Sequence, residues 1–389
     1  MQHLPADDLF NPTEEHRMLR QMVAEFARRE VEPQAAEFDH KGALNVPLFR
    51  RLGELGLLGI TVPDADGGAG MDTTAAVLVH HELAKYDPGF TLAYLAHSML
   101  FVNNFYHCSN AEQRAKYLAK SLSGEWIGAM GMTEPGYGTD VLGMTTTAVR
   151  DGDEYVVNGE KIFITSGMRA DWITVAVRTG EGKGAKDISL LLMPGDSAGL
   201  SRSRLDKMGW QCSDTAHLRF DGVRVPARYL LGEEGAGFKA IMGNFNAERF
   251  GIAAAALGFA QACYDEALAW AQQRKTFGSP LVGHQVMRHK LIDMQQRIRS
   301  TSAWLEQVAA RADAGDTGAD WVGEVCVLKN HATQTMQFCA DAGVQILGGM
   351  GYMRGTVCER IYREVKVLTI GGGTEEIMKD LAARQWGVV

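Results

Sequence analysis

The sequence predicts an α+β protein in which a helical N-terminal domain is followed by a middle β-domain and a C-terminal four-helix bundle. Apolar residues have helical spacing from residue 13 to about 122, and helical spacing returns after residue 235. Between these stretches, short runs rich in β-branched residues alternate with turn signals. The 389 residues suit two or three domains, because single cores stop growing near ~250–300 residues. We therefore expect domains at residues 1–125, 126–234 and 235–389.

The N-terminal domain is predicted from helix patterns and helix-start signals. Its first helix has one apolar stripe, formed by Leu19, Met22, Val23 and Phe26. Asn110 with Gln113 forms a capping box that opens a later helix. The acidic, glycine-rich stretch 64–70 is a loop, and the apolar stretch 92–100 is a packed helix.

The middle domain is predicted to be a compact, β-barrel-like set of short strands. Its strongest local signal is a hairpin, with strands at 155–157 and 161–165 joined by Asn158-Gly159. Further strands are expected at 172–177, 188–192, 215–220 and 223–225.

The C-terminal domain is predicted to contain three long helices and a shorter fourth. The long ones cover 248–274, 285–312 and 321–347, and the fourth begins near Thr374. Gly348-Gly349-Met350-Gly351 resembles a nucleotide-binding loop, but it follows a helix and opens no βαβ unit. A helix end, or a close backbone approach to a ligand, fits these glycines better.

Charge and composition exclude several classes of protein. A net charge of −8 and the lack of any Lys/Arg block argue against nucleic acid as a partner. No run of ~18 apolar residues could span a membrane. The first eight residues are acidic and lack the basic-then-apolar order of a signal peptide, so we expect a cytoplasmic enzyme.

Neither the cysteines nor the paired histidines predict a metal site. The six cysteines contain no Cys-x-x-Cys pair and mostly lie in apolar surroundings, which is typical of small buried hydrophobes in a reducing compartment. His80-His81 followed by Glu82 fits no zinc spacing, so we expect these residues on a helix face and no bound metal.

Two segments of the middle third have the chemistry to hold a flat, polar, aromatic cofactor. They cover residues 131–140 and 160–166. Both have the makings of a strand edge that carries small hydroxyl side chains and an aromatic residue, beside a glycine-rich bend. Threonine hydroxyls donate and accept hydrogen bonds, and Phe163 can cover the face of a ring.

Taken with later motifs, these segments resemble the flavin-binding strands of the acyl-CoA dehydrogenase family. The later motifs are Arg274-Lys275-Thr276-Phe277-Gly278, His284-Gln285, residues 345–352 and Gly373-Thr374-x-x-Ile377. The resemblance covers nearly the whole chain and is closest to the isovaleryl-CoA and long-chain branches. It implies that family's fold, bound FAD, an acyl-CoA substrate, an electron-transferring flavoprotein as acceptor and a homotetramer built as a dimer of dimers.

The resemblance also implies a set of cofactor-binding residues. Those of the middle domain are Met132, Thr133, Gly138, Thr139, Phe163 and Thr165, with the Thr165 hydroxyl near the flavin atom N5 that receives hydride. Those of the C-terminal domain are Arg274, Thr276, Phe277, Gln285, Gln345, Gly349, Thr374 and Glu376. Much of the second set serves the neighbouring subunit's FAD in this family. Taken alone, Arg274 and Lys275 would be a basic helix end that balances the helix dipole.

The family reaction removes a proton from the α-carbon of an acyl-CoA, so it requires a carboxylate base. Most members carry this base directly before the Gly-Thr pair near the C-terminus, but here that position is Gly372. The isovaleryl and long-chain branches carry it at the start of the first long C-terminal helix, which matches Glu248. We therefore predict Glu248 as the base. Its position alone is equally typical of a solvated glutamate in a first helical turn.

The resemblance implies contacts with the substrate from Thr139, Asn246, Arg249, Gly372 and Gly373. The Gly372 N–H would donate to the thioester oxygen, as in an oxyanion hole. Our hypothesis is that the missing side chain at this position admits a branched or wide acyl group. Two roles are open for Arg249: it contacts CoA or a loop of the site, or it is a structural ion-pair partner.

Two other functions remain open for this sequence. The same fold serves acyl-CoA oxidases and flavin monooxygenases, in which oxygen reacts with the flavin. A catalytically idle binding or assembly relative is the third possibility, supported only by Gly372. Acyl length, branching and pathway are not determined by these motifs.

Overall fold

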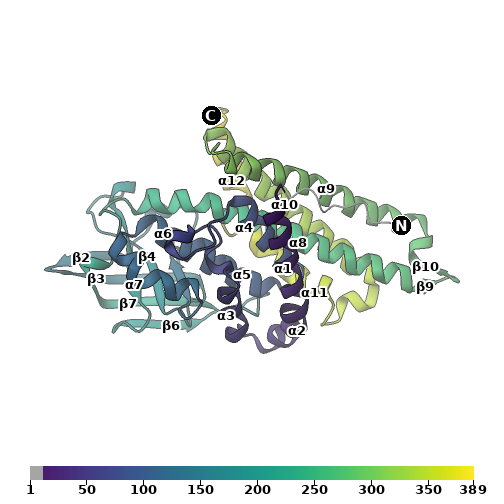
Figure 1. The fold of residues 1–389 in the computed structure, drawn as a ribbon, viewed down its shortest axis with the longest axis horizontal. Helices are drawn as coiled ribbons and strands as arrows, with labels where there is room; N and C mark the ends of the chain where they lie inside the picture. Colours follow the sequence, from purple (N-terminus) through teal and green to yellow (C-terminus); the bar gives the residue numbers. More distant parts are fainter. Residues whose placement is uncertain (1–11) are drawn as a thin grey trace.

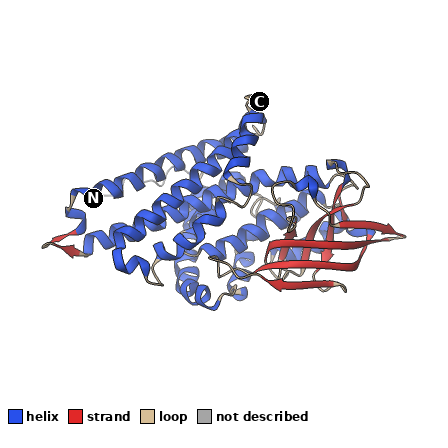
Figure 2. Ribbon diagram, turned by 180° about the vertical axis from the view of Figure 1, so that it is seen from behind, coloured by secondary structure: helices blue, strands red, loops and turns tan. Residues whose placement is uncertain are grey.

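The computed structural model describes residues 12–389, an elongated molecule with a β-sheet at one end and long helices along its axis (Figure 1). The order of helical, β and helical parts matches the predicted fold class. Figure 2 shows one large sheet beside the helices and a short separate hairpin at the opposite end of the molecule. The acidic start of the chain, where we found no signal-peptide order, lies outside the described residues.

The N-terminal part is helical, as predicted. Its α-helices are α1 (Glu14–Phe26), α2 (Glu32–Lys41), α3 (Val46–Glu54), α4 (Thr73–Ala84), α5 (Pro88–Leu95), α6 (Asn104–Cys108) and α7 (Ala111–Leu122). The predicted stripe of α1 faces the core, with Leu19, Val23 and Phe26 buried. The predicted capping box at Asn110 and Gln113 is present. The stretch 92–100 is helical, but it passes from α5 into a π-helical segment, η5 (Ala96–Asn103).

The middle part is a single sheet with strand order β6-β7-β3-β2-β4-β5-β8, and β1 pairs with β4. The strands are β1 (Gly128–Gly131), β2 (Thr147–Asp151), β3 (Glu154–Thr165), β4 (Trp172–Arg178), β5 (Ile188–Pro194), β6 (Leu200–Arg204), β7 (Thr215–Pro226) and β8 (Leu230–Leu231). The two strands predicted at 215–220 and 223–225 are one strand, β7, and strands β2, β6 and β8 were not predicted.

The predicted hairpin at Asn158-Gly159 is wrong. Both residues lie inside β3, which pairs with β7 along its length with one register shift at this point and a second between Lys161 and Ile164. Asn158 accepts a hydrogen bond from the Gly222 N–H across the sheet (2.8 Å), so its side chain stabilises a bulge and not a turn. A Cβ at Gly159 would lie 2.6 Å from the Thr146 hydroxyl, which explains the glycine. The actual tight turn joins β2 to β3 at Gly152, where φ is 65°.

The C-terminal part contains α8 (Gly237–Gln273), α9 (Gln285–Asp313), α10 (Ala319–Leu347), α11 (Val357–Leu368) and α12 (Glu375–Gln385). A small hairpin, β9 (Lys275–Thr276) with β10 (Ser279–Pro280), joins α8 to α9. Helices α9 and α10 and the helix after Thr374 match the prediction, whereas α8 begins earlier than predicted. Helix α11 was not predicted.

The start of α8 corrects an expectation that matters for function. We expected this helix to open at Glu248, but it begins at Gly237, so Glu248 lies about three turns inside it. The asparagines before Glu248 resemble helix-start signals. Tertiary contacts override them: Ile241 and Phe245 are buried against the sheet, and Asn244 donates to the Met99 carbonyl (3.0 Å).

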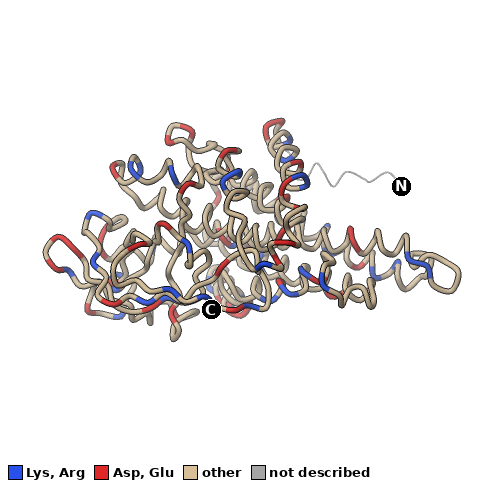
Figure 3. Tube along the Cα trace, turned by 90° about the horizontal axis from the view of Figure 1, so that it is seen from below, with Lys and Arg blue, Asp and Glu red and all other residues tan. Residues whose placement is uncertain are grey.

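Neither the charge distribution on the surface nor the cysteines indicate a functional site. Acidic and basic side chains are interspersed along the whole molecule (Figure 3). No helix within residues 12–389 is long and apolar enough to cross a membrane. The six cysteines are free thiols, five of them buried and Cys108 partly so, which confirms their predicted packing role.

Candidate active site

Glu248 projects from the middle of α8 into a closed environment. Its side chain is only 8% exposed, and Oε2 has no hydrogen-bond partner among the described residues. The alternative of a solvated first-turn glutamate therefore does not hold. A buried carboxylate oxygen without a partner has its acceptor capacity available for another molecule.

Burial is the main influence on the acidity of this carboxyl. Removal from water raises the pKa of Glu248 to about 7, while the positive charges of Arg249 and Lys329 act in the opposite direction. A carboxyl with a pKa near the working pH can both accept and release a proton.

A glycine loop at residues 371–373, between α11 and α12, lies against Glu248. A Cβ built on Gly372 would be 3.8 Å from the carboxyl carbon of Glu248. Arg249 Nε donates to the Gly372 carbonyl (3.0 Å), and Lys329 Nζ donates to the Gly373 carbonyl (2.7 Å). Asn246 in turn accepts from Arg249 Nη1 (3.1 Å). The structure thus brings together four predicted substrate residues with the predicted base.

Gly372 combines an available donor with a conformation that suits glycine. Its φ is 67°, a left-handed value that side-chain-bearing residues rarely adopt. Its N–H makes no hydrogen bond to any other part of the described chain. The room left by the missing side chain is partly taken, because a Cβ there would lie 2.7 Å from Ile252 Cδ1. The tip of Ile252, and not empty space, therefore lies next to this position.

The two predicted cofactor segments of the middle domain lie side by side. Residues 132–134 continue from β1 and run beside β3, where the Ile162 N–H donates to the Thr133 carbonyl (2.8 Å). A buried ion pair lies beneath them: Lys161 Nζ is 2.8 Å from Glu134 and also donates to the Met132 carbonyl (2.9 Å). This pair holds the two segments together, since its members come from different segments.

Phe163 stands out from this edge in a strained conformation. It lies in a second β-bulge of β3, has φ of 62° and is 66% exposed. Positive φ is unusual for an aromatic residue, and strain of this kind concentrates at functional sites. Nearby, the buried Ser166 hydroxyl is without a partner within residues 12–389. An exposed ring beside an unpartnered hydroxyl fits a flat, polar, aromatic group such as a flavin.

The predicted cofactor residues of the C-terminal domain lie mostly at the opposite end of the molecule. Arg274, Thr276 and Phe277 belong to the end of α8 and the β9–β10 hairpin, which Figure 1 shows far from the sheet. Phe277 is 99% exposed at the tip of this hairpin. Gln285 opens α9, Gln345 lies in the last turn of α10, and Gly349 follows that helix; all three residues are exposed. One chain therefore does not bring these residues to its own Phe163.

The remaining predicted residues lie in the loop after β1 and at the start of α12. Gly138 and Thr139 lie in the exposed loop after β1. The Thr374 hydroxyl caps α12 by accepting from the Ile377 N–H (3.4 Å), and Glu376 lies exposed in the first turn of that helix.

Sequence reasoning missed two charged pairs of this site, Lys329 beside Glu248 and the Glu134–Lys161 pair. A signal for Lys329 was present: it is the one lysine of α10 and falls four residues after the apolar Val325, on the stripe that faces the core. His80 and His81 lie buried in α4, as expected of a helix face.

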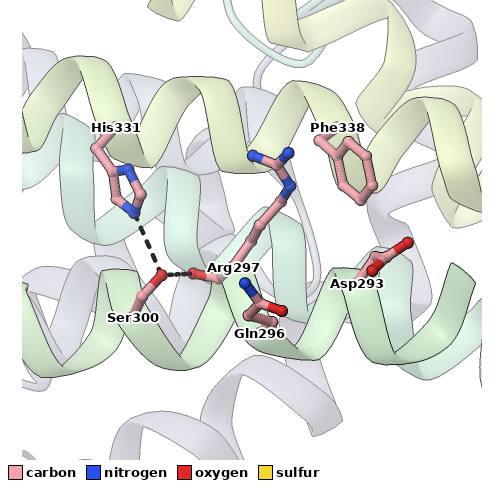
Figure 4. A pocket seen from close by; sticks show the side chains of 6 residues that line it. All are labelled: Asp293, Gln296, Arg297, Ser300, His331 and Phe338. Atoms are coloured by element: carbon pink, nitrogen blue, oxygen red, sulfur yellow. Dashed lines mark hydrogen bonds between the residues drawn. The ribbon is translucent and has the colours of Figure 1, made fainter. Parts of the chain in front are cut away.

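A surface pocket of about 420 Å³ lies between α9 and α10, away from these residues (Figure 4). Asp293, Gln296, Arg297 and Ser300 line it from α9, and His331 and Phe338 line it from α10. Arg297 stacks on the Phe338 ring at 4.2 Å, and Ser300 lies 3.4 Å from His331 Nε2. It shares no residue with the predicted site, so we do not assign the reaction to it.

Family comparisons cover nearly the whole chain. The description "Acyl-CoA dehydrogenase, N-terminal domain" matches residues 13–125, the middle domain of the same family matches 129–223, and its C-terminal domain matches 235–387.

Individual proteins show the same similarity. The chain is 38% identical over 378 residues to the probable acyl-CoA dehydrogenase YngJ of Bacillus subtilis, covering 97% of this chain and 99% of that protein. It is 36% identical over 388 residues to the mitochondrial isovaleryl-CoA dehydrogenase of Pongo abelii, covering 98% and 91%.

Solved structures agree. A probable acyl-CoA dehydrogenase from Mycobacterium abscessus superimposes with a TM-score of 0.93 at 44% identity, covering 97% of this chain and all of that one. A glutaryl-CoA dehydrogenase from Mycobacterium smegmatis in complex with FADH2 gives a TM-score of 0.92 at 27% identity, covering 99% and 97%.

Proposed function

The chain belongs to the acyl-CoA dehydrogenase family of FAD-dependent oxidoreductases, and from that premise we propose that it dehydrogenates an acyl-CoA with Glu248 as the base. The observation that carries the proposal is the buried Glu248 carboxylate, whose Oε2 is unpartnered in the described chain and which faces the 371–373 loop. The other position for a base, 372, is a glycine.

In the proposed reaction, Glu248 accepts the proton that leaves the α-carbon of the acyl group, and the product is a 2-enoyl-CoA. When bound, FAD supplies the two-electron acceptor for the hydride that leaves the β-carbon. A base with a raised pKa suits this step, because proton transfer is most efficient when the pKa lies near the working pH.

The Gly372 N–H is proposed to donate to the thioester oxygen. Negative charge grows on that oxygen as the α-proton leaves, and a preorganised backbone N–H stabilises it without reorganisation. The proposal is supported by the absence of any acceptor for this N–H within residues 12–389.

The middle-domain residues are proposed to hold the flavin ring. Phe163 would cover it, while Thr133, Thr139 and Thr165 would offer their hydroxyls. The residues of the β9–β10 hairpin are too far along the molecule to serve the same FAD (Figure 1). We infer that they serve the FAD of a second copy, in a homotetramer arranged as a dimer of dimers.

The substrate is proposed to be a branched or otherwise wide acyl-CoA. Similarity to isovaleryl-CoA dehydrogenase supports this. Ile252 Cδ1 takes part of the space beside Gly372, so an acyl group that uses this space must displace the end of that side chain. The electron acceptor is proposed to be an electron-transferring flavoprotein, with oxygen as the alternative in an oxidase.

Anaerobic addition of straight, branched and aromatic acyl-CoAs to the FAD-loaded protein tests the proposal. We expect bleaching of the yellow flavin band, fastest with a branched chain. Failure of every acyl-CoA to bleach the band would favour the idle binding protein. Steady peroxide formation in air would favour the oxidase.

A further inference from the structure

Lys329 is a buried cation that the proposed reaction does not yet use. It lies in the middle of α10, and its side chain is 0% exposed. Removing an ammonium group from water costs several kcal/mol unless the surroundings compensate. The presence of a lysine at this place therefore needs a reason.

The contact that Lys329 makes is with the backbone of the 371–373 loop. Its Nζ donates to the Gly373 carbonyl (2.7 Å), next to the carbonyl that Arg249 holds (3.0 Å). A peptide unit is planar, so fixing a carbonyl also fixes the direction of the following N–H. Lys329 and Arg249 thus orient two successive peptide units on either side of Gly373, where φ of 111° leaves the backbone otherwise permissive.

The charges around Lys329 come from two other helices. They are Glu248 and Arg249 of α8 and Glu375 of α12, and the neutral Cys326 thiol of α10 is also nearby. Neither Lys329 nor Arg249 forms an ion pair with Glu248 within 4.0 Å in the part of the chain that is described. Their charges therefore stabilise the carboxylate from a distance and leave its oxygens free.

We propose that Lys329 is a positioning residue for the dehydrogenation, which holds the 371–373 loop against Glu248 and favours the ionised form of that carboxylate without binding it. This proposal rests on Glu248 being the base. A neutral donor such as glutamine could hold the Gly373 carbonyl equally well. What only a cation adds is the electrostatic support of Glu248.

Three variants separate the two parts of this role. Lys329→Gln keeps a donor without the charge, Lys329→Met removes both, and Lys329→Arg keeps both. We expect about a tenfold fall in kcat for Lys329→Gln and a larger fall for Lys329→Met, because positioning is lost in the second. We expect Lys329→Arg to restore most of the rate.

The decisive readout is the ionisation of Glu248 itself. Difference infrared spectra follow its carboxyl band against pH, and Glu248→Gln identifies that band by removing it. We expect the apparent pKa to rise by about one in Lys329→Gln and Lys329→Met, and to stay unchanged in Lys329→Arg. A purely structural lysine would leave it unchanged in all three.

Lys366→Gln is the matched control, because Lys366 is exposed on α11 close to the same loop. It should change neither rate nor ionisation. A folded, FAD-containing Lys329→Gln protein with wild-type kcat and wild-type carboxyl titration overturns the proposal. If the neutral variants do not fold, a raised carboxyl pKa in Lys329→Arg overturns it, and an unchanged one supports it.

The same spectra distinguish a failure of this inference from a failure of the proposed function. If Glu248→Gln still bleaches the flavin at the wild-type rate, Glu248 is not the base. The infrared spectra still measure the effect of Lys329 on the ionisation of Glu248, whether or not Glu248 is the base.

Discussion

Two buried glutamates of this protein have opposite surroundings. Glu134, 3% exposed, contacts Lys161 directly and accepts from the Thr145 and Thr146 N–H groups (2.6 and 2.9 Å). Burial alone would raise the pKa of Glu134, but the lysine and these donors hold it at about 2. Glu248 is similarly buried, yet its neighbouring cations stay out of contact and its pKa rises to about 7.

The difference shows that burial does not decide what a glutamate does. Where donors occupy the carboxylate oxygens, the group is permanently charged and joins two segments of backbone. Where they do not, the group remains able to exchange a proton. The following predictions test this contrast, from the largest expected effect to the smallest.

Glu248→Gln should slow flavin bleaching by substrate by about 10²–10⁴-fold, since the amide cannot accept the α-proton. The flavin spectrum before substrate addition should be unchanged. Stopped-flow absorbance under anaerobic conditions measures both. Glu54→Gln, at an exposed position on α3, is the control. If the flavin of Glu248→Gln bleached at the wild-type rate, Glu248 would not be the base, and neither buried glutamate would exchange a proton with the substrate.

Lys161→Met should lower the free energy of unfolding by about 3–5 kcal/mol, because it leaves the Glu134 carboxylate buried and unpaired. Urea denaturation measures the loss. Adding Glu134→Gln to this variant should recover part of it, since the amide carries no charge. A loss below about 1 kcal/mol in Lys161→Met would mean that the pair is as weak as a surface one.

Glu248→Gln should be more stable than the wild type at pH 8, with little difference at pH 4. The native pKa of Glu248, about 7, exceeds the ordinary 4.5, so its contribution is complete below pH 4.5 and is lost as pH rises through 7. The gap between the two proteins should widen by about 3 kcal/mol over this range.

Glu134 should show the reverse dependence. Its native pKa is lowered to about 2, so its stabilisation is present above pH 4.5 and is lost as pH falls toward 2. Urea titrations at several pH values check both glutamates together. Parallel pH profiles for the two would contradict the contrast.

Thr145→Val should lower the free energy of unfolding by about 1 kcal/mol, which is the smallest of these effects. It removes one donor to Glu134, the Thr145 hydroxyl at 2.8 Å, while Lys161 and two backbone N–H groups remain. Urea denaturation again provides the measurement. A loss as large as that of Lys161→Met would show that the hydroxyl, and not the ion pair, holds Glu134.

Local patterns predicted many elements correctly. The stripe of α1, the capping box at Asn110 and the long helices α9 and α10 depend on residues three or four positions apart, and these interact wherever the helix lies. The Asn158-Gly159 hairpin failed because the same two residues also suit a bulge, and the partner strand β7 decides between them. The start of α8 failed because burial of Ile241 and Phe245 extended the helix beyond its local signals.

The sequence by itself determined the order of the three parts, the glycine at position 372 and the carboxylate at position 248. Tertiary structure decided that this carboxylate is buried and unpartnered within residues 12–389, that Phe163 is exposed in a bulge, and that Lys329 holds Gly373. The physical reason is distance along the chain. Arg249 lies 123 residues from Gly372, and Lys329 lies 44 from Gly373, so no local pattern encodes contacts that only the packing of α8 and α10 creates.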